Sequence, residues 1–303
     1  MKNRIFCILG LLIFSLFSFS CAIMGFAGQV TSLVGTITDN PLLEAAGSSV
    51  SAVSEASSPI TPSQEYYIGR SVAAQILGTY DLYENETMTD YVNKVCQVLV
   101  INSNRSEVYN GYHVAILDTT QINAFATSGG HILVTRGLLE CATSEDALAA
   151  VLAHEIAHVQ LQHGISSIKS SRWTNAATTL AGATLTALSD GEIDDVMESF
   201  GETVNSMVST MVETGYSKSQ EYDADEVALE ILNEAGYNPY AMISMLEVLE
   251  EKQPNSSGGF ASTHPSAKSR LKKVKKALRD YDEVKIPEIR IERFNDKMNI
   301  VTE

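Results

Sequence analysis

The stretch from Ser144 to Gly164, SEDALAAVLAHEIAHVQLQHG, constrains the fold of this chain more than any other. It opens with residues that cap helices, and Glu145 and Asp146 follow in the first turn, where the helix dipole favours acids. Residues 147–153 are apolar on every side, which is typical of a helix buried in a core. Gly164 is a typical helix stop. The stretch therefore predicts one buried helix that ends at Gly164.

This helix carries His154, Glu155 and His158. At about 100° per residue, the two histidines leave the same face about 40° apart. Two imidazoles at this spacing form a bidentate zinc site, and the adjacent glutamate reaches a water on the same metal. The alternative is a helix with two unrelated histidines, which would bury three polar groups at a cost of a few kcal/mol. We predict one zinc ion held by His154 and His158, with Glu155 as the catalytic base.

A zinc site of this kind needs a third protein ligand and an open position. A third histidine at the metzincin spacing is excluded, because glycine stands there. The next candidate is a helix predicted over residues 217–235, with Ser217 and Gln220 as a capping box. Glu221 and Asp225 lie one turn apart at the border of its apolar face. We predict Glu221 as the third ligand and Asp225 as a catalytic acid that holds an imidazole or assists the leaving group. The alternative is that both acids are solvated.

These two segments carry a resemblance. His154–His158 (HEIAH) followed by Glu221–Asp225 (EYDAD) is similar to the gluzincin metallopeptidase family of HtpX, the CAAX prenyl protease and the soluble periplasmic BepA- and LoiP-type proteases. Other matching segments are Gly69-Arg70, Asn123–Ala126, Gly129-Gly130, Gly137–Leu139, and His264-Pro265 before Arg270. The chain departs from the family at Ser128, where proline is common. The resemblance implies an α+β, zincin-like (minigluzincin) fold, mostly helical with a small mixed sheet beside the metal-binding helix, and a stand-alone zinc endopeptidase.

The rest of the domain reads as short elements. Helices are predicted over 62–77 and 88–101, and strands over 112–117, 121–126, 131–135 and 286–291, with a hairpin turn at 128–130. An edge strand beside the metal helix binds an extended peptide through its backbone. Asn123, Ala124 and Phe125 are therefore the predicted substrate strand. His113, His131 and His163 are interpreted as ordinary strand and helix-end residues.

His264 stands before Pro265 and a basic helix. Three interpretations stay open: a fourth zinc ligand that must leave before substrate binds, a donor to the oxyanion, or a residue that merely precedes the helix. The basic residues after it, Arg270 among them, are interpreted as a solvated face.

The N-terminus reads as a secretory signal, residues 1–20, with Lys2 and Arg4 before an apolar run. Ser20-Cys21-Ala22 favours a bacterial lipoprotein with lipid on Cys21, and cleavage after Ala27 is the alternative. Residues 21–60 are then a lipid anchor and flexible tether, and 61–303 the zinc metallopeptidase domain. This predicts a membrane-anchored protein of the cell envelope that faces the periplasm from the outer membrane, or otherwise a soluble periplasmic protein.

A formal net charge of −16 argues against nucleic acid as a partner. Cys96 and Cys141 form a disulfide or stay as two buried thiols, and the oligomeric state has no signal in the sequence. Polypeptides are the expected partners, with misfolded or misassembled envelope proteins as substrates. The alternative function is a latched zinc protein that acts mainly as a periplasmic chaperone or binding module.

Overall fold

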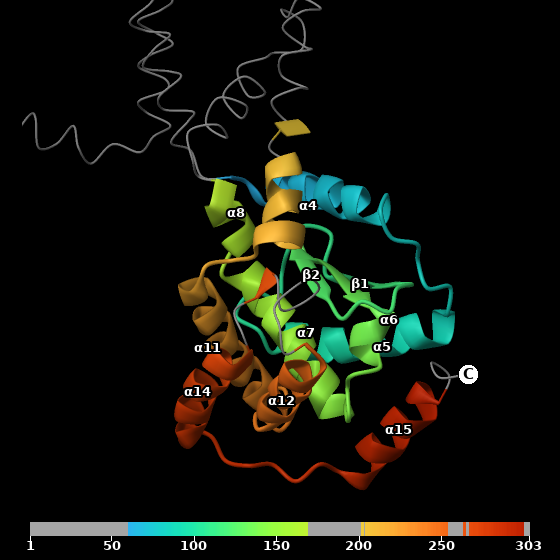
Figure 1. Cartoon of the computed structure of the whole chain (residues 1–303), viewed down its shortest axis with the longest axis vertical. Coiled ribbons are helices and arrows are strands. Elements are labelled where there is room, and N and C mark those ends of the chain that lie inside the picture. The colour runs from blue at the N-terminus through green and yellow to red at the C-terminus, as the bar shows by residue number, and fades with distance from the viewer. Residues whose placement is uncertain (1–59, 169–200, 203, 254–262, 265–266, 300–303) are drawn as a thin grey trace, which may run out of the picture. The chain divides into compact units, whose positions relative to one another are not determined.

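The computed structural model describes residues 60–168, 201–202, 204–253, 263–264 and 267–299 (Figure 1). The chain divides into two compact units, 1–60 with 169–203 and 61–168 with 204–303, and almost all described residues belong to the second. The predicted signal segment, Cys21 and nearly all of the predicted tether lie outside the described residues. None of the described helices has both the length and the hydropathy that a membrane span requires.

Two capped helices open the second unit. Helix α4 (Pro62–Leu77) begins with a capping box between Thr61 and Gln64 and has proline at its first position. Helix α5 (Glu86–Ile101) is capped by Asn85, whose side chain accepts a hydrogen bond from the Met88 amide. The first helix was predicted from its cap and proline and the second, over 88–101, from its apolar periodicity, and both predictions are confirmed, with α5 beginning two residues earlier.

A mixed three-stranded sheet follows, in the order β1-β3-β2. Strand β1 (His113–Leu117) pairs in parallel with β3 (His131–Thr135), and β2 (Ala124–Thr127) pairs antiparallel with β3. Gly129 and Gly130, with φ of 81° and 92°, form the turn between β2 and β3. The side chain of Asn93 bonds the Val114 amide and carbonyl on the outer edge of β1. Strand β2 is the other edge of the sheet.

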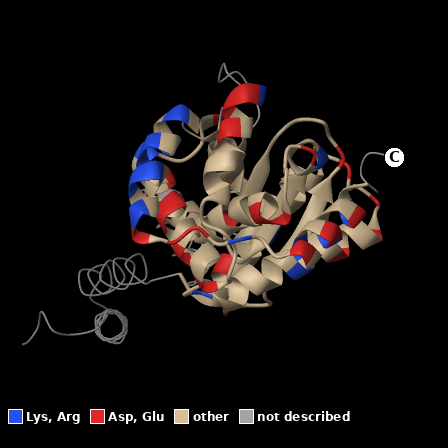
Figure 2. Ribbon diagram, turned by 90° about the horizontal axis from the view of Figure 1, so that it is seen from below, with Lys and Arg blue, Asp and Glu red and all other residues tan. Residues whose placement is uncertain are grey.

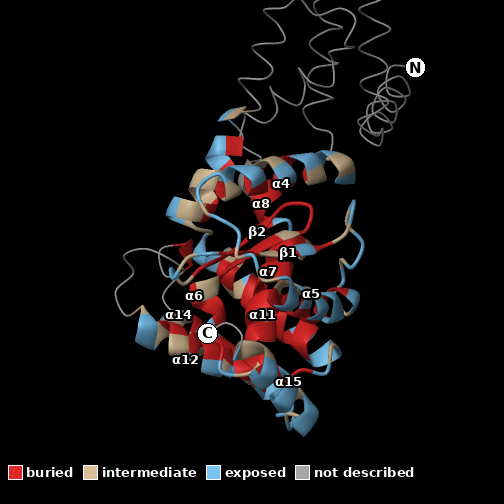
Figure 3. Cartoon of the chain, turned by 90° about the vertical axis from the view of Figure 1, so that its right-hand side faces the viewer, coloured by how far each residue is buried: buried red, intermediate tan, exposed pale blue. Residues whose placement is uncertain are grey.

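Helix α7 (Glu145–Gln160) follows the short helix α6 (Arg136–Leu139) in the chain. It lies in the middle of this unit, and nearly all of its residues are buried (Figure 3). The predicted cap at Ser144 is confirmed. The predicted stop at Gly164 is wrong, because α7 ends at Gln160 and Gly164 lies inside helix α8 (His163–Ile168). Gln162 reverses the chain between them with φ of 54°. Gly164 meets a packing need instead, since a Cβ there would lie 2.9 Å from the Ser128 hydroxyl oxygen.

The C-terminal half surrounds α7 with helices. After the π-helix η1 (Thr210–Thr214) come α11 (Lys218–Glu234), α12 (Ala241–Lys252), α14 (Ala267–Ala277), the 3-10 turn η2 (Leu278–Asp280) and α15 (Glu288–Met298). The predicted capping box between Ser217 and Gln220 is confirmed at the start of α11. Helices α5, α11 and α12 and strand β2 all pack against α7. The structure is thus mostly helical with a small mixed sheet, as predicted.

The strand predicted over 286–291 is wrong, because α15 begins at Glu288. Phe294 on α15 is buried, while Arg290 and Arg293 form ion pairs with the buried acids Asp146 and Glu145 at the start of α7. These tertiary contacts favour a helix over the extended form that the local alternation suggested.

Candidate metal centre

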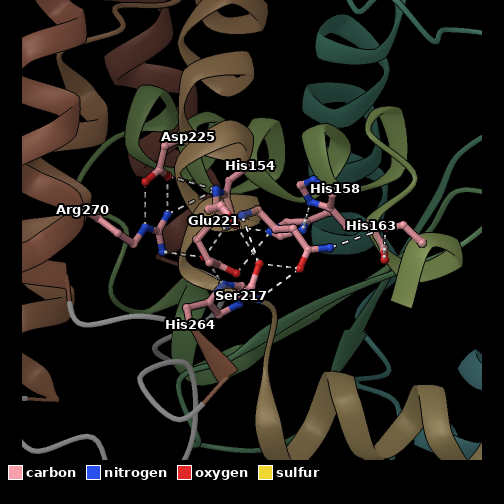
Figure 4. A network of polar contacts seen from close by, with 11 residues as sticks. His154, His158, His163, Ser217, Glu221, Asp225, His264 and Arg270 are labelled. Atoms are coloured by element: carbon pink, nitrogen blue, oxygen red, sulfur yellow. Dashed lines mark hydrogen bonds and ion pairs between the residues drawn. The ribbon is translucent and has the colours of Figure 1, made fainter. Parts of the chain in front are cut away.

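The two histidines of α7 and the glutamate of α11 converge on one point (Figure 4). The Nε2 atoms of His154 and His158 lie 3.1 Å apart. Glu221 places one carboxylate oxygen 3.5 Å from His154 Nε2 and the other 3.6 Å from His158 Nε2. Ligands at about 2.05 Å from a tetrahedral zinc ion would lie about 3.3 Å apart. The three predicted ligands are therefore spaced as a zinc ion requires.

His264 reaches the same point from the C-terminal side. Its Nδ1 lies 2.8 Å from Glu221 Oε2, and its side chain is buried. One ligand atom each from His154, His158, Glu221 and His264 can be chosen so that all lie within 4.8 Å of one another. Among the described residues this is the one cluster of histidine, cysteine and acidic side chains that could hold a metal ion.

Asp225 lies behind His154 rather than at the centre of the cluster. Its Oδ1 is 3.1 Å from His154 Nδ1, the ring nitrogen that points away from the other imidazole. Arg270 binds the same carboxylate through two hydrogen bonds, of 2.9 and 2.6 Å, and its Nη1 lies 3.8 Å from Glu221 Oε2. Asp225 therefore contacts the imidazole of His154. The first of its two predicted roles, to hold an imidazole, needs such a contact, and the second, to assist the leaving group, stays a prediction.

Arg270 was interpreted as part of a solvated basic face, and this is wrong, since only 2% of the residue is exposed. The lysines of α14 do form an exposed basic stripe, shown in blue in Figure 2: Lys268, Lys272, Lys273, Lys275 and Lys276. Within α14, Arg270 shares the inner face with Val274, so the period of the helix separates it from the lysines. The helical period of the sequence predicts that Arg270 and Val274 share one face, but it does not predict that Arg270 binds Asp225.

Two further residues of the site were missed. His163 is buried, and its Nδ1 lies 2.9 Å from Nδ1 of His158. Tyr216 stacks on the His158 ring, with centroids 4.4 Å apart and planes 20° apart. His163 was misread because it lies off the metal face of α7, which ends before it. No signal in the sequence pointed to Tyr216.

The charges of the site favour a divalent cation. Glu155, Glu221 and Asp225 are buried beside one buried guanidinium, that of Arg270, a formal balance of −2 with neutral histidines. Oε1 of Glu155 and Oε1 of Glu221 are buried without a hydrogen-bond partner among the described residues. Buried carboxylate oxygens without partners are costly unless a cation neutralises them. The donor set of two imidazoles and a carboxylate suits zinc.

The pKa shifts agree with this charge balance. Burial alone would lower the pKa of His154, but contacts with Asp225 and Glu221 raise it to about 9. Burial raises the pKa of Glu221, and the nearby His264 and His154 outweigh that effect and hold it well below its ordinary value. Glu155 behaves differently, because burial keeps its pKa above the ordinary range. The neighbouring acids thus favour positive charge on His154, whereas burial holds the pKa of His158 well below its ordinary value. Of the three buried acids, Glu155 is the one whose pKa is raised.

The outer edge of β2 lies across a small cavity from Glu155 and His264, beside the candidate metal site. The Thr135 amide donates to the Asn123 carbonyl, so by antiparallel alternation the backbone groups of Ala124 and Ala126 point away from β3. A cavity of about 10 Å³ lies between this edge, Glu155 and the covering residues, which are Met211, Gly215, Tyr216, Thr263 and His264. That volume is about what one water molecule needs. Of the three predicted substrate-strand residues, Ala124 and Phe125 line this cavity and Asn123 does not, and their contact with substrate stays a prediction.

Residues 86–278 match peptidase family M48. The chain belongs to this family. It is 29% identical over 223 residues to the beta-barrel assembly-enhancing protease of Escherichia coli O157:H7. The aligned region covers 71% of this chain and 44% of that protein. It is 33% identical over 192 residues to the mitochondrial metalloendopeptidase OMA1 of Schizosaccharomyces pombe, 63% of this chain and 53% of that one.

A third relative is the metalloprotease LoiP of Escherichia coli K12, 26% identical over 157 residues, 51% of this chain and 58% of LoiP. The chain spans about half the length of these curated relatives. The resemblance read from the sequence, to the family that includes the BepA and LoiP types, is confirmed. Cys96 and Cys141 are both buried, and no disulfide joins them in the structure.

Proposed function

We propose that this chain is a zinc-dependent endopeptidase with a zincin-like fold. The observation that carries the proposal is the convergence of His154, His158 and Glu221, with Glu155 beside them and the edge of β2 opposite. The family membership supports it, and the relatives named above are proteases.

In the proposed site, His154, His158 and Glu221 hold the zinc ion. When bound there, zinc lowers the pKa of a water molecule towards neutrality and polarises the substrate carbonyl. Glu155 removes a proton from the attacking water and delivers it to the departing amine. The raised pKa of Glu155, which burial causes, brings its proton affinity nearer to neutral pH and suits this exchange.

In this proposal the peptide substrate binds along the outer edge of β2. The outward carbonyl of Ala124 and the outward backbone groups of Ala126 would pair with an extended peptide, which positions the scissile bond without reading side chains. The Ala124 amide donates to Asn123 Oδ1 at 2.9 Å and would have to exchange that bond for one to substrate. Binding of this kind suits unfolded polypeptides. Because the cavity holds about one water molecule, Tyr216 and the Thr263–His264 segment must move before a peptide enters.

The cell compartment is part of the proposal. The N-terminal pattern around Cys21 and the kinship with the assembly-enhancing protease and LoiP support a lipid-anchored or soluble enzyme of the bacterial envelope. Misfolded or misassembled envelope proteins are the substrates that fit this location.

The contact between His264 and Glu221 favours a second candidate, a latched zinc protein that binds polypeptides and seldom cleaves them. Removal and return of the metal tests both. Dialysis against a chelator should abolish casein hydrolysis, and one equivalent of zinc should restore it. Stoichiometric zinc without hydrolysis, even after denatured proteins are offered, would favour the binding protein over the enzyme.

A further inference from the structure

His158 and His163 meet through the same ring atom. Nδ1 of His163 lies 2.9 Å from Nδ1 of His158, within hydrogen-bond distance, and only 6% of His163 is exposed. The Nε2 atom of His158, on the other side of its ring, faces His154 and Glu221. The proposed zinc ligand is therefore held from behind by a second imidazole, which is the first residue of α8.

A hydrogen bond between two neutral imidazole nitrogens contains one proton. If His158 offers the lone pair of Nε2 to zinc, its own proton resides on Nδ1. The Nδ1–H group then donates to His163, so Nδ1 of His163 is bare and its proton lies on Nε2. We propose that His163 is a positioning residue, which fixes the ring orientation and metal-binding tautomer of His158. This inference rests on the proposed zinc site.

The two proposed histidine ligands are held by different chemistry. His154 has the carboxylate of Asp225 behind it, at 3.1 Å, and Arg270 binds that carboxylate in turn. His158 has behind it an imidazole, that of His163, at 2.9 Å, rather than a carboxylate. A neutral acceptor orients His158 without adding another buried negative charge to a site that already holds three carboxylates. Loss of such a partner behind a metal ligand typically weakens metal binding about 10- to 100-fold.

A separate set of contacts holds His163 where it is. The left-handed backbone of Gln162 turns the chain into α8, and its side chain donates to Glu65 on α4 at 3.2 Å. Arg105 binds both oxygens of Glu65, at 3.0 and 2.6 Å, and the Val159 carbonyl at 2.8 Å. Glu65 is buried. Its contacts with Arg105 and Gln162, here called the Glu65 clamp, hold the α7–α8 turn from outside the candidate metal site.

Two substitutions separate the hydrogen bond from packing. His163→Asn keeps an acceptor near the position of Nδ1 but is smaller than histidine, whereas His163→Leu nearly keeps the volume and loses the acceptor. Zinc affinity is measured by competition with a chromophoric chelator, and the melting temperature in excess chelator reports folding separately. His113→Leu, at an exposed strand histidine, is the matched control. The inference predicts that His163→Leu binds zinc about 10- to 100-fold more weakly and that His163→Asn binds within about threefold of wild type.

The reverse order, with His163→Asn weaker than His163→Leu, would assign His163 to packing and overturn the inference. Equal zinc affinities in all variants would overturn it as well. If the leucine variant does not fold, nitrogen-15 NMR of the zinc-loaded wild type decides, through a protonated Nδ1 on His158 and a protonated Nε2 on His163. A protonated Nδ1 on His163 contradicts the inference. A wild-type protein that binds no zinc would instead refute the proposed function, so the two failures are distinguishable.

Discussion

The ion pair between Asp225 and Arg270 links the candidate metal site, formed by His154, His158, Glu221 and His264, to helix α14. Both side chains are almost fully buried, and they share two hydrogen bonds. Burial raises the pKa of Asp225, but the Arg270 guanidinium and His154 outweigh this and leave it below the ordinary value. The pair therefore remains charged inside the protein, and either partner alone would be a buried charge without its counterion.

This arrangement predicts strong coupling between the two residues. Asp225→Leu and Arg270→Met should each lower the free energy of unfolding by about 3–5 kcal/mol, whereas the double variant Asp225→Leu/Arg270→Met should lose less than either single variant. Urea titrations in chelator measure these effects without a contribution from bound metal. Additive losses in the double-mutant cycle would show that the ion pair does not hold the two residues together.

His264 gives a second prediction, because its three interpretations predict different changes in the rate of casein hydrolysis when the side chain is removed. If its contact with Glu221 is part of a latch, substrate enters only from the fraction of molecules in which the latch is open. His264→Ala should then raise the rate of casein hydrolysis. A donor to the oxyanion would instead lower turnover by about a hundredfold on removal. A residue that only precedes α14 would change it little. We expect the increase, and a decrease at unchanged zinc content would contradict the latch.

At the scale of elements, α4 lies directly on the turn between β2 and β3. A Cβ at Gly69 would stand 1.4 Å from the Ser128 carbonyl oxygen and 2.5 Å from its carbon. Backbone atoms cannot give way as a flexible side chain can, so the helix and the turn would have to separate. This close approach sets the distance from α4 to the strand that faces the metal cluster.

Gly69→Ala should therefore destabilise the protein by about 1–3 kcal/mol or more, the usual range for overpacking. The matched control is Gly201→Ala, at a helical residue where an added Cβ would meet no described atom within 4 Å, which should be neutral or stabilising by about 0.5–1 kcal/mol. Urea unfolding of both variants checks the difference. Equal stabilities would mean that α4 moves away from the turn without cost.

The elements that sequence reasoning predicted well have local causes. Ser144 and the Ser217–Gln220 capping box mark the starts of α7 and α11 because capping uses side chains within three residues of the helix start. The failures have non-local causes. Gln162 adopts a left-handed backbone that the Glu65 clamp supports, and α15 forms where Arg290 meets Asp146. Local patterns contain no information about such distant partners.

At the scale of the molecule, the site gathers side chains from segments that are far apart in the chain. The convergence of the three proposed ligands could be predicted because His154 and His158 share one helix and Glu221 lies in the first turn of another capped helix. The residues behind them could not, since Arg270 and His163 are single residues whose roles depend on the packing of α14 and α8. The sequence thus predicts the centre of the site better than its surroundings.

The central claim, that Glu155 is the base of a zinc peptidase, is tested most directly by the turnover of Glu155→Gln. The substitution removes the proton acceptor and leaves His154, His158 and Glu221 in place. Zinc content and melting temperature should match the wild type, while casein hydrolysis should fall about 100-fold or more, because general-base catalysis contributes about 10²–10⁴. Activity above about a tenth of wild type at full zinc content would contradict the account, since the base would then lie elsewhere.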